Sequence, residues 1–288
     1  MRIVTHNSHY HPDDLFAVSA LLLKFPEAEV VRSRDPEVIE SGDIVVDVGF
    51  IYDPKKLRFD HHQKGGAGER PNGVPYASFG LVWKEFGEEI AGGHEEARLI
   101  DERLGMPIDG NDNAMDISIP VISGVREYTI QDYFFSFAQD AETSEEFDRA
   151  FSIALPMAKS LLEREIASAK HAVESWRIVK EIYNESEDKH IIVVPGGLRW
   201  KRALIPTEAL FAVFPRPDGK WSARAVPKEH TSFEVKKQFP ASWAGVGPEM
   251  LVNISGVPNA VFCHRDTHLA VATTKEGAIK LAEIALNS

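Results

Sequence analysis

Cysteine is nearly absent from this sequence, since Cys263 is its only cysteine in 288 residues. An internal disulfide is therefore excluded, and a zinc site built from several cysteines is not expected. No run approaches 18 uncharged apolar residues, so the sequence holds no candidate transmembrane helix. Residues Met1 to His6 enter a strand pattern directly and lack the features of a signal peptide. Together these absences predict a cytoplasmic protein with no membrane partner.

Basic residues are outnumbered by acidic ones, with 32 Lys and Arg against 44 Asp and Glu and a formal net charge of -12. Such a balance argues against a protein that coats nucleic acid. The excess reverses over residues 199–237, which contain nine Lys or Arg and four Asp or Glu. This segment is the best candidate for contact with an anionic substrate, and a solvated face with ordinary scatter of charge is the alternative.

The first half of the chain predicts an α/β lobe with a mostly parallel sheet. Short β-branched runs alternate there with helical patterns, which is typical of βαβ units. We expect strands over 2–5, 29–32 and 44–48 and a helix over 13–25. Ligands of such sheets bind at the carboxyl ends of the strands, beside helix N-termini. Residues that follow these strands are therefore the first candidates for a site.

The second half predicts a helical connector followed by a smaller α+β lobe. Apolar residues at three- and four-residue spacing predict helices over 76–86, 95–104 and, as the connector, 144–184. The smaller lobe should contain a hairpin with its turn at Arg216–Gly219. Its expected strands are 191–195, 210–214, 221–226, 260–263 and 269–273, before a closing helix over 275–286. We predict two domains, a catalytic lobe with its connector over 1–185 and the smaller lobe over 186–288.

Three histidines and two carboxylates lie within nine positions, from His6 to Asp14, directly before an apolar helix. Each one alone could be a loop histidine or a helix N-cap. Together they indicate metal ligation, because imidazole and carboxylate groups suit divalent metals. A second candidate is Asp47, which ends an apolar strand. A buried charge at that position needs a metal, an arginine or several hydrogen-bond donors.

Two further clusters complete the pattern. Asp60-His61-His62 follows a strand-like stretch, and Ile108–Asn113 contains two carboxylates in a run that could also be a polar turn. Four separate loops that each offer His or Asp form the pattern that a dinuclear site requires, since two ions about 3.5 to 4 Å apart need a bridging carboxylate and several terminal ligands. The sequence therefore predicts a hydrolytic centre with two metals.

In this order the motifs resemble the DHH phosphoesterase superfamily, and within it the branch of the melanocyte-proliferating-gene product and its bacterial relatives. The resemblance covers nearly the whole chain. Its carriers are Thr5-His6-Asn7, His11-Pro12-Asp13-Asp14, Val45–Gly49, Asp60-His61-His62-Gln63, Asp109–Asn113, Gly256-Val257-Pro258 and Phe262-Cys263-His264. It implies a metal-dependent phosphoesterase.

The resemblance also implies a role for each motif residue. The expected metal ligands are His6, His11 and Asp47 for one ion, and Asp13, Asp47, His61 and either Asp109 or Asp112 for the other, with Asp47 bridging. His62 would face the scissile phosphate, and Asp60 would orient a histidine from outside the ligand set. In the smaller lobe, the residues expected to grip the substrate phosphate are Lys201, Arg202, Arg224 and His264.

The identity of the two divalent ions stays open. The resemblance implies Mn²⁺ first, with Mg²⁺ or Zn²⁺ as alternatives. His11 stands where many superfamily members have Asp, which makes the first site richer in nitrogen. His9 and Asp14 are extra candidates with no assigned role.

The resulting functional hypothesis is a phosphodiesterase or 3′ to 5′ exonuclease acting on RNA or short oligonucleotides. The negative charge of the chain suits small nucleotides at least as well, because long polymers need extended electrostatic contact. A metal-binding regulatory protein without turnover is an alternative, although His62 would be superfluous in it. A zinc hydrolase of amides is another, but the sequence contains no His-Glu-x-x-His helix. Whether the chain forms a homodimer is left open.

Overall fold

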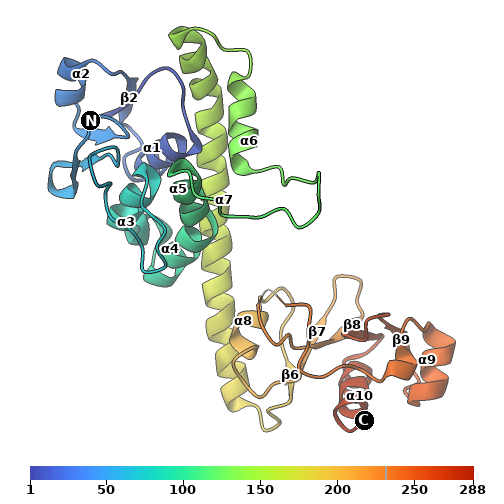
Figure 1. Ribbon diagram of the computed structural model, residues 1–288. Coiled ribbons are helices and arrows are strands. Elements are labelled where there is room, and N and C mark those ends of the chain that lie inside the picture. The colour runs from blue at the N-terminus through green and yellow to red at the C-terminus, as the bar shows by residue number, and fades with distance from the viewer. Residues whose placement is uncertain (231) are drawn as a thin grey trace. The chain divides into compact units, whose positions relative to one another are not determined.

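The computed structural model describes residues 1–230 and 232–288. The chain divides into two compact units, Met1–Lys170 and His171–Ser288 (Figure 1). The division falls inside the long helix α7 (Ser144–Glu185), which was expected as a connector over 144–184. The predicted domain boundary after residue 185 stays a prediction. Within the described ranges, no helix is both long and apolar enough to cross a bilayer.

The first unit is built on a five-stranded sheet with the order β2-β1-β3-β5-β4. Its strands are β1 (Arg2–Thr5), β2 (Glu29–Arg32), β3 (Ile44–Val46), β4 (Tyr52–Asp53) and β5 (Arg58–Phe59). β1 is parallel to both β2 and β3, β3 is parallel to β5, and β4 alone is antiparallel to its neighbour. This confirms the predicted α/β class with a mostly parallel sheet. Its apolar strands β1 and β3 are buried at nearly every position, as expected for a sheet covered on both faces.

The order of the strands places a topological switch between β1 and β3. The chain leaves β1 toward β2 on one side, and β3 and β5 lie on the other side. Because β1, β3 and β5 are parallel and in register, their carboxyl ends lie next to one another. Loops at such a point diverge and leave a crevice for ligands. The residues that enter this crevice follow Thr5, Val46 and Phe59 directly.

Helices and short helical turns make up the rest of this unit. They are α1 (Pro12–Lys24), α2 (Pro36–Glu40), the 3₁₀ turn η1 (Pro54–Lys56), α3 (Ser78–Ala91), α4 (His94–Ile100), the π turn η2 (Asp101–Gly105), α5 (Met106–Asp112), α6 (Ile130–Phe135) and the 3₁₀ turn η3 (Ser136–Ala138). Of these, α1, α2 and α3 pack against the sheet. α1 is apolar on nearly all sides and packs closely against α3, which explains its deep burial.

The cluster over Ile108–Asn113 is helical up to Asp112, so its interpretation as a polar turn is wrong. Turn propensity favours Asp, Asn and Gly in loops. Here Ile108 is buried and the Asp109 carboxylate pairs with Arg70, and these tertiary contacts outweigh the local preference. Two of the residues expected on loops therefore lie on α5.

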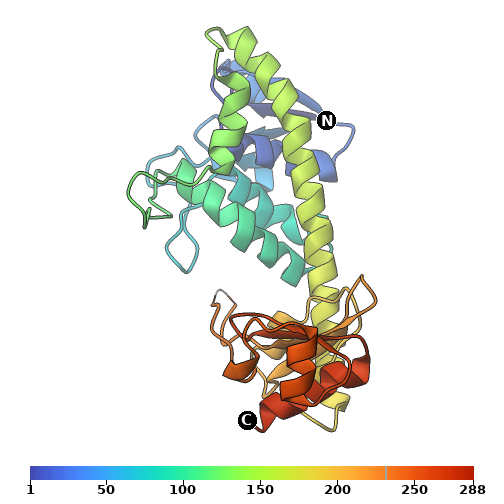
Figure 2. The ribbon, with the colours of Figure 1, turned by 90° about the vertical axis from the view of Figure 1, so that its right-hand side faces the viewer.

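The second unit is a smaller α+β unit around a second five-stranded sheet, with the order β6-β7-β8-β10-β9. Its strands are β6 (Ile191–Val193), β7 (Phe211–Pro215), β8 (Trp221–Ala225), β9 (Ala260–Cys263) and β10 (Leu269–Ala272). Its helices are α8 (Lys201–Leu204), the 3₁₀ turn η4 (Ala241–Trp243), α9 (Pro248–Ser255) and α10 (Lys275–Leu286). The predicted hairpin is confirmed as the antiparallel pair β7 and β8, and α10 packs against β7, β8 and β10 (Figure 2).

Candidate metal centre

The loop between β1 and α1 holds the first two candidate ligands. His6 is buried at the carboxyl end of β1, while His11 stands in extended conformation directly before Pro12, the first residue of α1. The backbone amide of His11 donates to Asp14 Oδ1 at 2.8 Å, which fixes the start of the helix. The same loop therefore presents two imidazoles from opposite ends.

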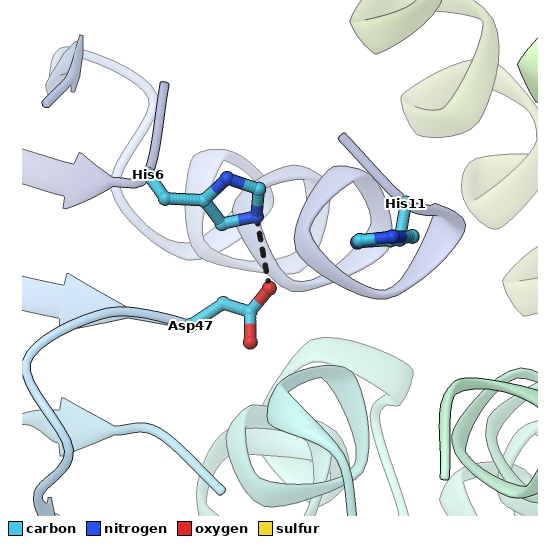
Figure 3. A group of neighbouring side chains, drawn as sticks. All are labelled: His6, His11 and Asp47. Atoms are coloured by element: carbon cyan, nitrogen blue, oxygen red, sulfur yellow. Dashed lines mark hydrogen bonds and ion pairs between the residues drawn. The ribbon is translucent and has the colours of Figure 1, made fainter. Parts of the chain in front are cut away.

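Asp47 lies between these imidazoles and the rest of the site. It follows β3 directly, has a left-handed backbone with φ 56°, and is 2% exposed. Its Oδ2 atom lies 3.1 Å from His6 Nε2, and its Oδ1 atom accepts from Ser78 Oγ at 3.1 Å. His6, His11 and Asp47 offer ligand atoms that all lie within 4.8 Å of one another (Figure 3).

A second group of ligand-type side chains lies on the other side of Asp47. Asp13, His61 and Asp112 also offer atoms within 4.8 Å of one another. His61 Nε2 is 3.1 Å from Asp112 Oδ2 and 3.4 Å from Asp47 Oδ1. Asp47 is therefore in contact with a member of each group, the position that a bridging carboxylate would occupy.

The first turn of α3 holds the carboxylate of Asp13. The backbone amides of Ser78 and Phe79 donate to its two oxygens at 2.9 and 2.7 Å. Such amides at a helix N-terminus stabilise negative charge. Ser78 therefore contacts both Asp13 and Asp47. No motif of the sequence points to this serine, and its place at the beginning of a predicted helix is the one local signal for it.

His62 is oriented by Asp60. The Nδ1 atom of His62 is 2.8 Å from Asp60 Oδ1, which also accepts from the His62 backbone amide at 2.9 Å. The other oxygen of Asp60 accepts from the backbone amide of Phe50 at 2.6 Å. The Asp60 carboxylate is buried, while the His62 side chain is 51% exposed. The imidazole is thus held at one nitrogen and accessible to solvent.

Asp109 and Asp112 have different surroundings. The Asp109 carboxylate is buried, lies 2.8 Å from Arg70 Nη2 and accepts from the Gly80 amide at 3.0 Å. Burial raises its pKa to about 7, against the opposing effect of Arg70. Asp112, one turn further along α5, is the carboxylate that reaches His61. The structure therefore brings Asp112 into the second group and places Asp109 in an ion pair with Arg70, which the sequence analysis missed.

Several buried carboxylates lie close together in this site. Burial raises the pKa of Asp13 well above its ordinary value, and the neighbouring carboxylates of Asp112, Asp47 and Asp109 raise it further. Burial likewise raises the pKa of Asp14 to about 6. Burial alone would raise the pKa of Asp47, but the hydrogen bond with His6 and the nearby imidazole of His61 hold that pKa below the ordinary range. Such crowding of carboxylates is costly without a cation.

Asp14 Oδ2 is buried and has no hydrogen-bond partner within the described part of the chain. The nearest recorded neighbour of Asp14 Oδ2 is His6 Nε2, 3.6 Å away. Unsatisfied buried polar atoms are rare in folded proteins and often point to an ion. With imidazole and carboxylate donors in this site, the residues fit divalent metals such as Mn²⁺ or Zn²⁺.

The four predicted substrate-binding residues all lie in the second unit. Lys201 and Arg202 are on α8, Arg224 is in β8, and His264 follows β9. Lys201 and Arg224 are close enough that the arginine, after burial, lowers the pKa of the lysine. Arg202 instead places its guanidinium 4.4 Å from the ring centre of Trp176. Lys201, Arg224 and His264 thus belong to one cluster, here called the positive cluster. Arg202 instead faces α7.

His268 joins this cluster and was missed by the sequence analysis. Its ring centre lies 4.3 Å from that of His264. Burial lowers the pKa of His268, and the neighbouring His264, Arg224 and Lys201 lower it further. The backbone amide of Asp266 donates to His264 Nδ1 at 3.2 Å, which leaves the Nε2 atom to carry the proton. The spacing of two histidines across the turn between β9 and β10 was the available signal.

Known proteins are similar in sequence to nearly the whole of this chain. The model of a family described as Uncharacterised protein family (UPF0160) matches residues 2–286. The chain is 28% identical over 330 residues to the MYG1 exonuclease of Homo sapiens, covering 99% of this chain and 85% of that protein. It is 29% identical over 330 residues to the MYG1 exonuclease of Rattus norvegicus, covering 99% and 84%. It is 27% identical over 322 residues to the MYG1 protein of Dictyostelium discoideum, covering 100% and 97%.

Proposed function

The chain belongs to the uncharacterised protein family UPF0160, and from this membership and the geometry of its His and Asp side chains we propose that it is a metal-dependent phosphoesterase. The sequence motifs described above predicted membership of this same family. Two of the relatives are named exonucleases, which supports a nuclease among the phosphoesterases. The finer proposal is a phosphodiesterase that removes nucleotides from the 3′ end of RNA or short oligonucleotides.

The position of Asp47 carries this proposal. Its carboxylate touches His6 of one ligand group and His61 of the other, at 3.1 and 3.4 Å. A two-metal centre needs one carboxylate in that place. A structural role alone would be met by the hydrogen bond from Ser78 and one imidazole.

Each group of ligands would hold one ion. His6, His11 and Asp47 would hold the first, and Asp47, Asp13, His61 and Asp112 the second. Mn²⁺ is the first choice, and Mg²⁺ or Zn²⁺ are the alternatives. When bound, such ions activate water and stabilise charge on the leaving oxygen. Asp109 would act through its ion pair with Arg70, by keeping α5 and therefore Asp112 in place.

His62 is the residue that would meet the substrate. Asp60 accepts a hydrogen bond from Nδ1, and this bond raises the pKa of His62 and favours the protonated ring. The protonated ring keeps an N–H at Nε2 for a phosphate oxygen. Because the side chain is half exposed, this donor is accessible from solvent. A purely regulatory metal protein would have no use for it.

The positive cluster of the second unit would bind phosphate groups of the substrate. Lys201 and Arg224 supply fixed charge, and His264 and His268 supply neutral or charged N–H donors. Arg202 is expected to contribute less, since its guanidinium stacks on Trp176. We further propose that the protein is cytoplasmic, that it binds RNA or small nucleotides, and that it forms a homodimer. Each of these three points can be measured directly.

Hydrolysis by metal-stripped protein tests the proposal. Bis-p-nitrophenyl phosphate and a 5′-labelled RNA would be incubated with added Mn²⁺, Mg²⁺ or Zn²⁺, with the wild-type chain beside Asp47→Asn and Asp43→Asn. Asp43 is an exposed carboxylate at the opposite end of β3 and is the matched control. We expect metal-dependent cleavage that only Asp47→Asn abolishes, and a ladder of 5′-labelled products shortened from the 3′ end. Tight metal binding with no cleavage under any metal would favour the regulatory alternative.

A further inference from the structure

A hollow of about 620 Å³ opens beside His11, within the first unit. Its walls come from three stretches of chain: the loop before α1, the segment around α6, and the first turns of α7, which runs beside α6 (Figure 1). The volume lies within the range of about 300 to 1,000 Å³ that is typical of small-molecule sites. His11 belongs both to this wall and to the first group of metal ligands.

Aromatic rings dominate the walls of the hollow. Phe135 stands edge-on to the His11 ring, with centres 6.0 Å apart and planes at 79°. Phe147 packs against His9, with ring centres 4.2 Å apart. Tyr128 is 70% exposed and Phe135 is 44% exposed. Large aromatic side chains that line a hollow and stay accessible are typical of a surface that binds a flat ligand.

The charge of the hollow is low although a carboxylate lies in its wall. Asp132 accepts two hydrogen bonds from the Arg126 guanidinium, both at 2.9 Å, and further bonds from Thr129. The Arg126 contact is the main reason that the pKa of Asp132 is held below its ordinary range, so the charge is present but paired. The other polar groups of the wall include the hydroxyl of Ser136, the amide of Gln139 and the imidazoles of His9 and His11. The described residues of the wall include no lysine or arginine to pair with a phosphate, whereas a neutral ring would find aromatic faces.

We propose that this hollow binds the nucleobase of the nucleotide whose phosphate lies at the neighbouring metal ligands. The inference rests on the proposed phosphoesterase function and assigns its substrate class as nucleotides with an accessible, unstacked base. Phe135 and Tyr128 would stack on the base, which is tolerant of sequence because every base has an aromatic face. Gln139 would contact the edge of the ring. One sugar joins a base to its phosphate, so a single nucleotide would reach from the hollow to His11.

Binding of a fluorescent base tests the inference without turnover. A phosphorothioate-linked dinucleotide that contains 2-aminopurine, and its abasic counterpart, would be titrated in Mg²⁺ with wild type, Tyr128→Ala and Phe135→Ala. Phe233→Ala, which removes a fully exposed aromatic ring of the second unit, is the control. Hydrolysis of bis-p-nitrophenyl phosphate, which has no base, is measured on the same samples. Tyr128→Phe retains the ring and should restore binding.

We expect each alanine variant to weaken 2-aminopurine binding about tenfold and to reduce its quenching, because one stacked base loses one aromatic partner. Binding of the abasic dinucleotide and hydrolysis of the base-free ester should stay within about twofold of wild type. Unchanged 2-aminopurine binding would overturn the inference, and so would an equal loss for both dinucleotides. If wild type binds the base but hydrolyses no ester with any metal, the proposed function fails and the base site stands.

Discussion

The guanidinium of Arg70 lies 2.8 Å from the buried carboxylate of Asp109, and this ion pair holds the helical turn that carries Asp112 to His61. Arg70 also makes two hydrogen bonds to Asp101, in the π turn before α5. The two carboxylates of α5 therefore have different partners. Asp109 pairs with Arg70, and Asp112 faces His61.

Substitution of Asp109 or Asp112 by asparagine should show which of them supports the fold and which supports metal binding. Asp109→Asn leaves the buried Arg70 with the carboxylate of Asp101 and the carbonyl of Pro75, so we expect a loss of stability somewhat below the roughly 3 to 5 kcal/mol of a fully unpaired buried charge. Asp112→Asn removes one carboxylate from a crowded site, so the metal-free protein should be as stable as wild type while Mn²⁺ affinity falls at least about tenfold. Urea unfolding and isothermal titration would measure the two effects. The opposite pattern would identify Asp109 as the ligand.

Gly80 leaves room for the Asp109 carboxylate, and a methyl group there should disturb it. A Cβ atom on Gly80 would lie 1.8 Å from Asp109 Oδ2 and 2.6 Å from Arg70 Nη2. We expect Gly80→Ala to lower the free energy of unfolding by about 1 to 3 kcal/mol and to weaken metal binding through α5. Gly247→Ala is the control, because a Cβ there meets nothing within 4 Å. Equal unfolding midpoints for the two variants in urea would contradict this.

Metal binding should stabilise the fold, because it neutralises buried carboxylates that repel one another. At a Mn²⁺ concentration of 100 times its dissociation constant, linkage predicts a gain of about 2.7 kcal/mol. Scanning calorimetry of stripped and reloaded protein would measure the rise in Tm. Asp47→Asn should abolish most of this rise, and Asp43→Asn should retain it. A similar rise in both variants would show that Mn²⁺ acts elsewhere.

Loss of the His62 imidazole should reduce turnover without loss of metal. His62 is held by Asp60 and is the accessible donor of the site. We expect His62→Gln to lower kcat on bis-p-nitrophenyl phosphate about 10² to 10⁴-fold, the usual range for a lost proton donor. Mn²⁺ affinity, measured by calorimetric titration, should change less than about threefold. Asp60→Asn should have a smaller effect on kcat, since it only weakens the orientation of the ring. A large fall in affinity in His62→Gln would make this histidine a ligand instead.

The positive cluster of the second unit should be required for RNA and dispensable for a small ester. We expect Lys201→Ala and Arg224→Ala to raise the KM for a 5′-labelled oligonucleotide and to reduce the slope of log affinity against log salt by about one each. Arg202→Ala, on the same helix as Lys201, is the matched control because its guanidinium faces Trp176. Salt titrations by fluorescence anisotropy would measure the slopes. Equal slopes for all three variants would remove the cluster from the substrate site.

Much of the fold could be predicted because it depends on local pattern. The bounds of β1, β2, β9 and α10 agree with the expected strands and closing helix, since each is a short apolar run between strong local signals. α10, for example, begins after Thr274, whose side chain accepts from the Gly277 amide at 3.1 Å. Strand β3 is shorter than expected, because Asp47 turns into a left-handed conformation. That turn points its carboxylate into the site.

The sequence by itself determined which residues follow parallel strands, and therefore that His6, Asp47 and His61 would meet at one edge of the sheet. This holds because strand polarity and alternation are local properties of the chain. Only the tertiary structure gave Asp109 and Asp112 their different partners, added Ser78 and His268 to their clusters, and gathered Tyr128, Phe135 and Phe147 around one hollow. Those outcomes depend on contacts between residues that are distant in sequence or separated by a turn. A single sequence holds no record of such distances, whereas packing of helices on the sheet fixes them.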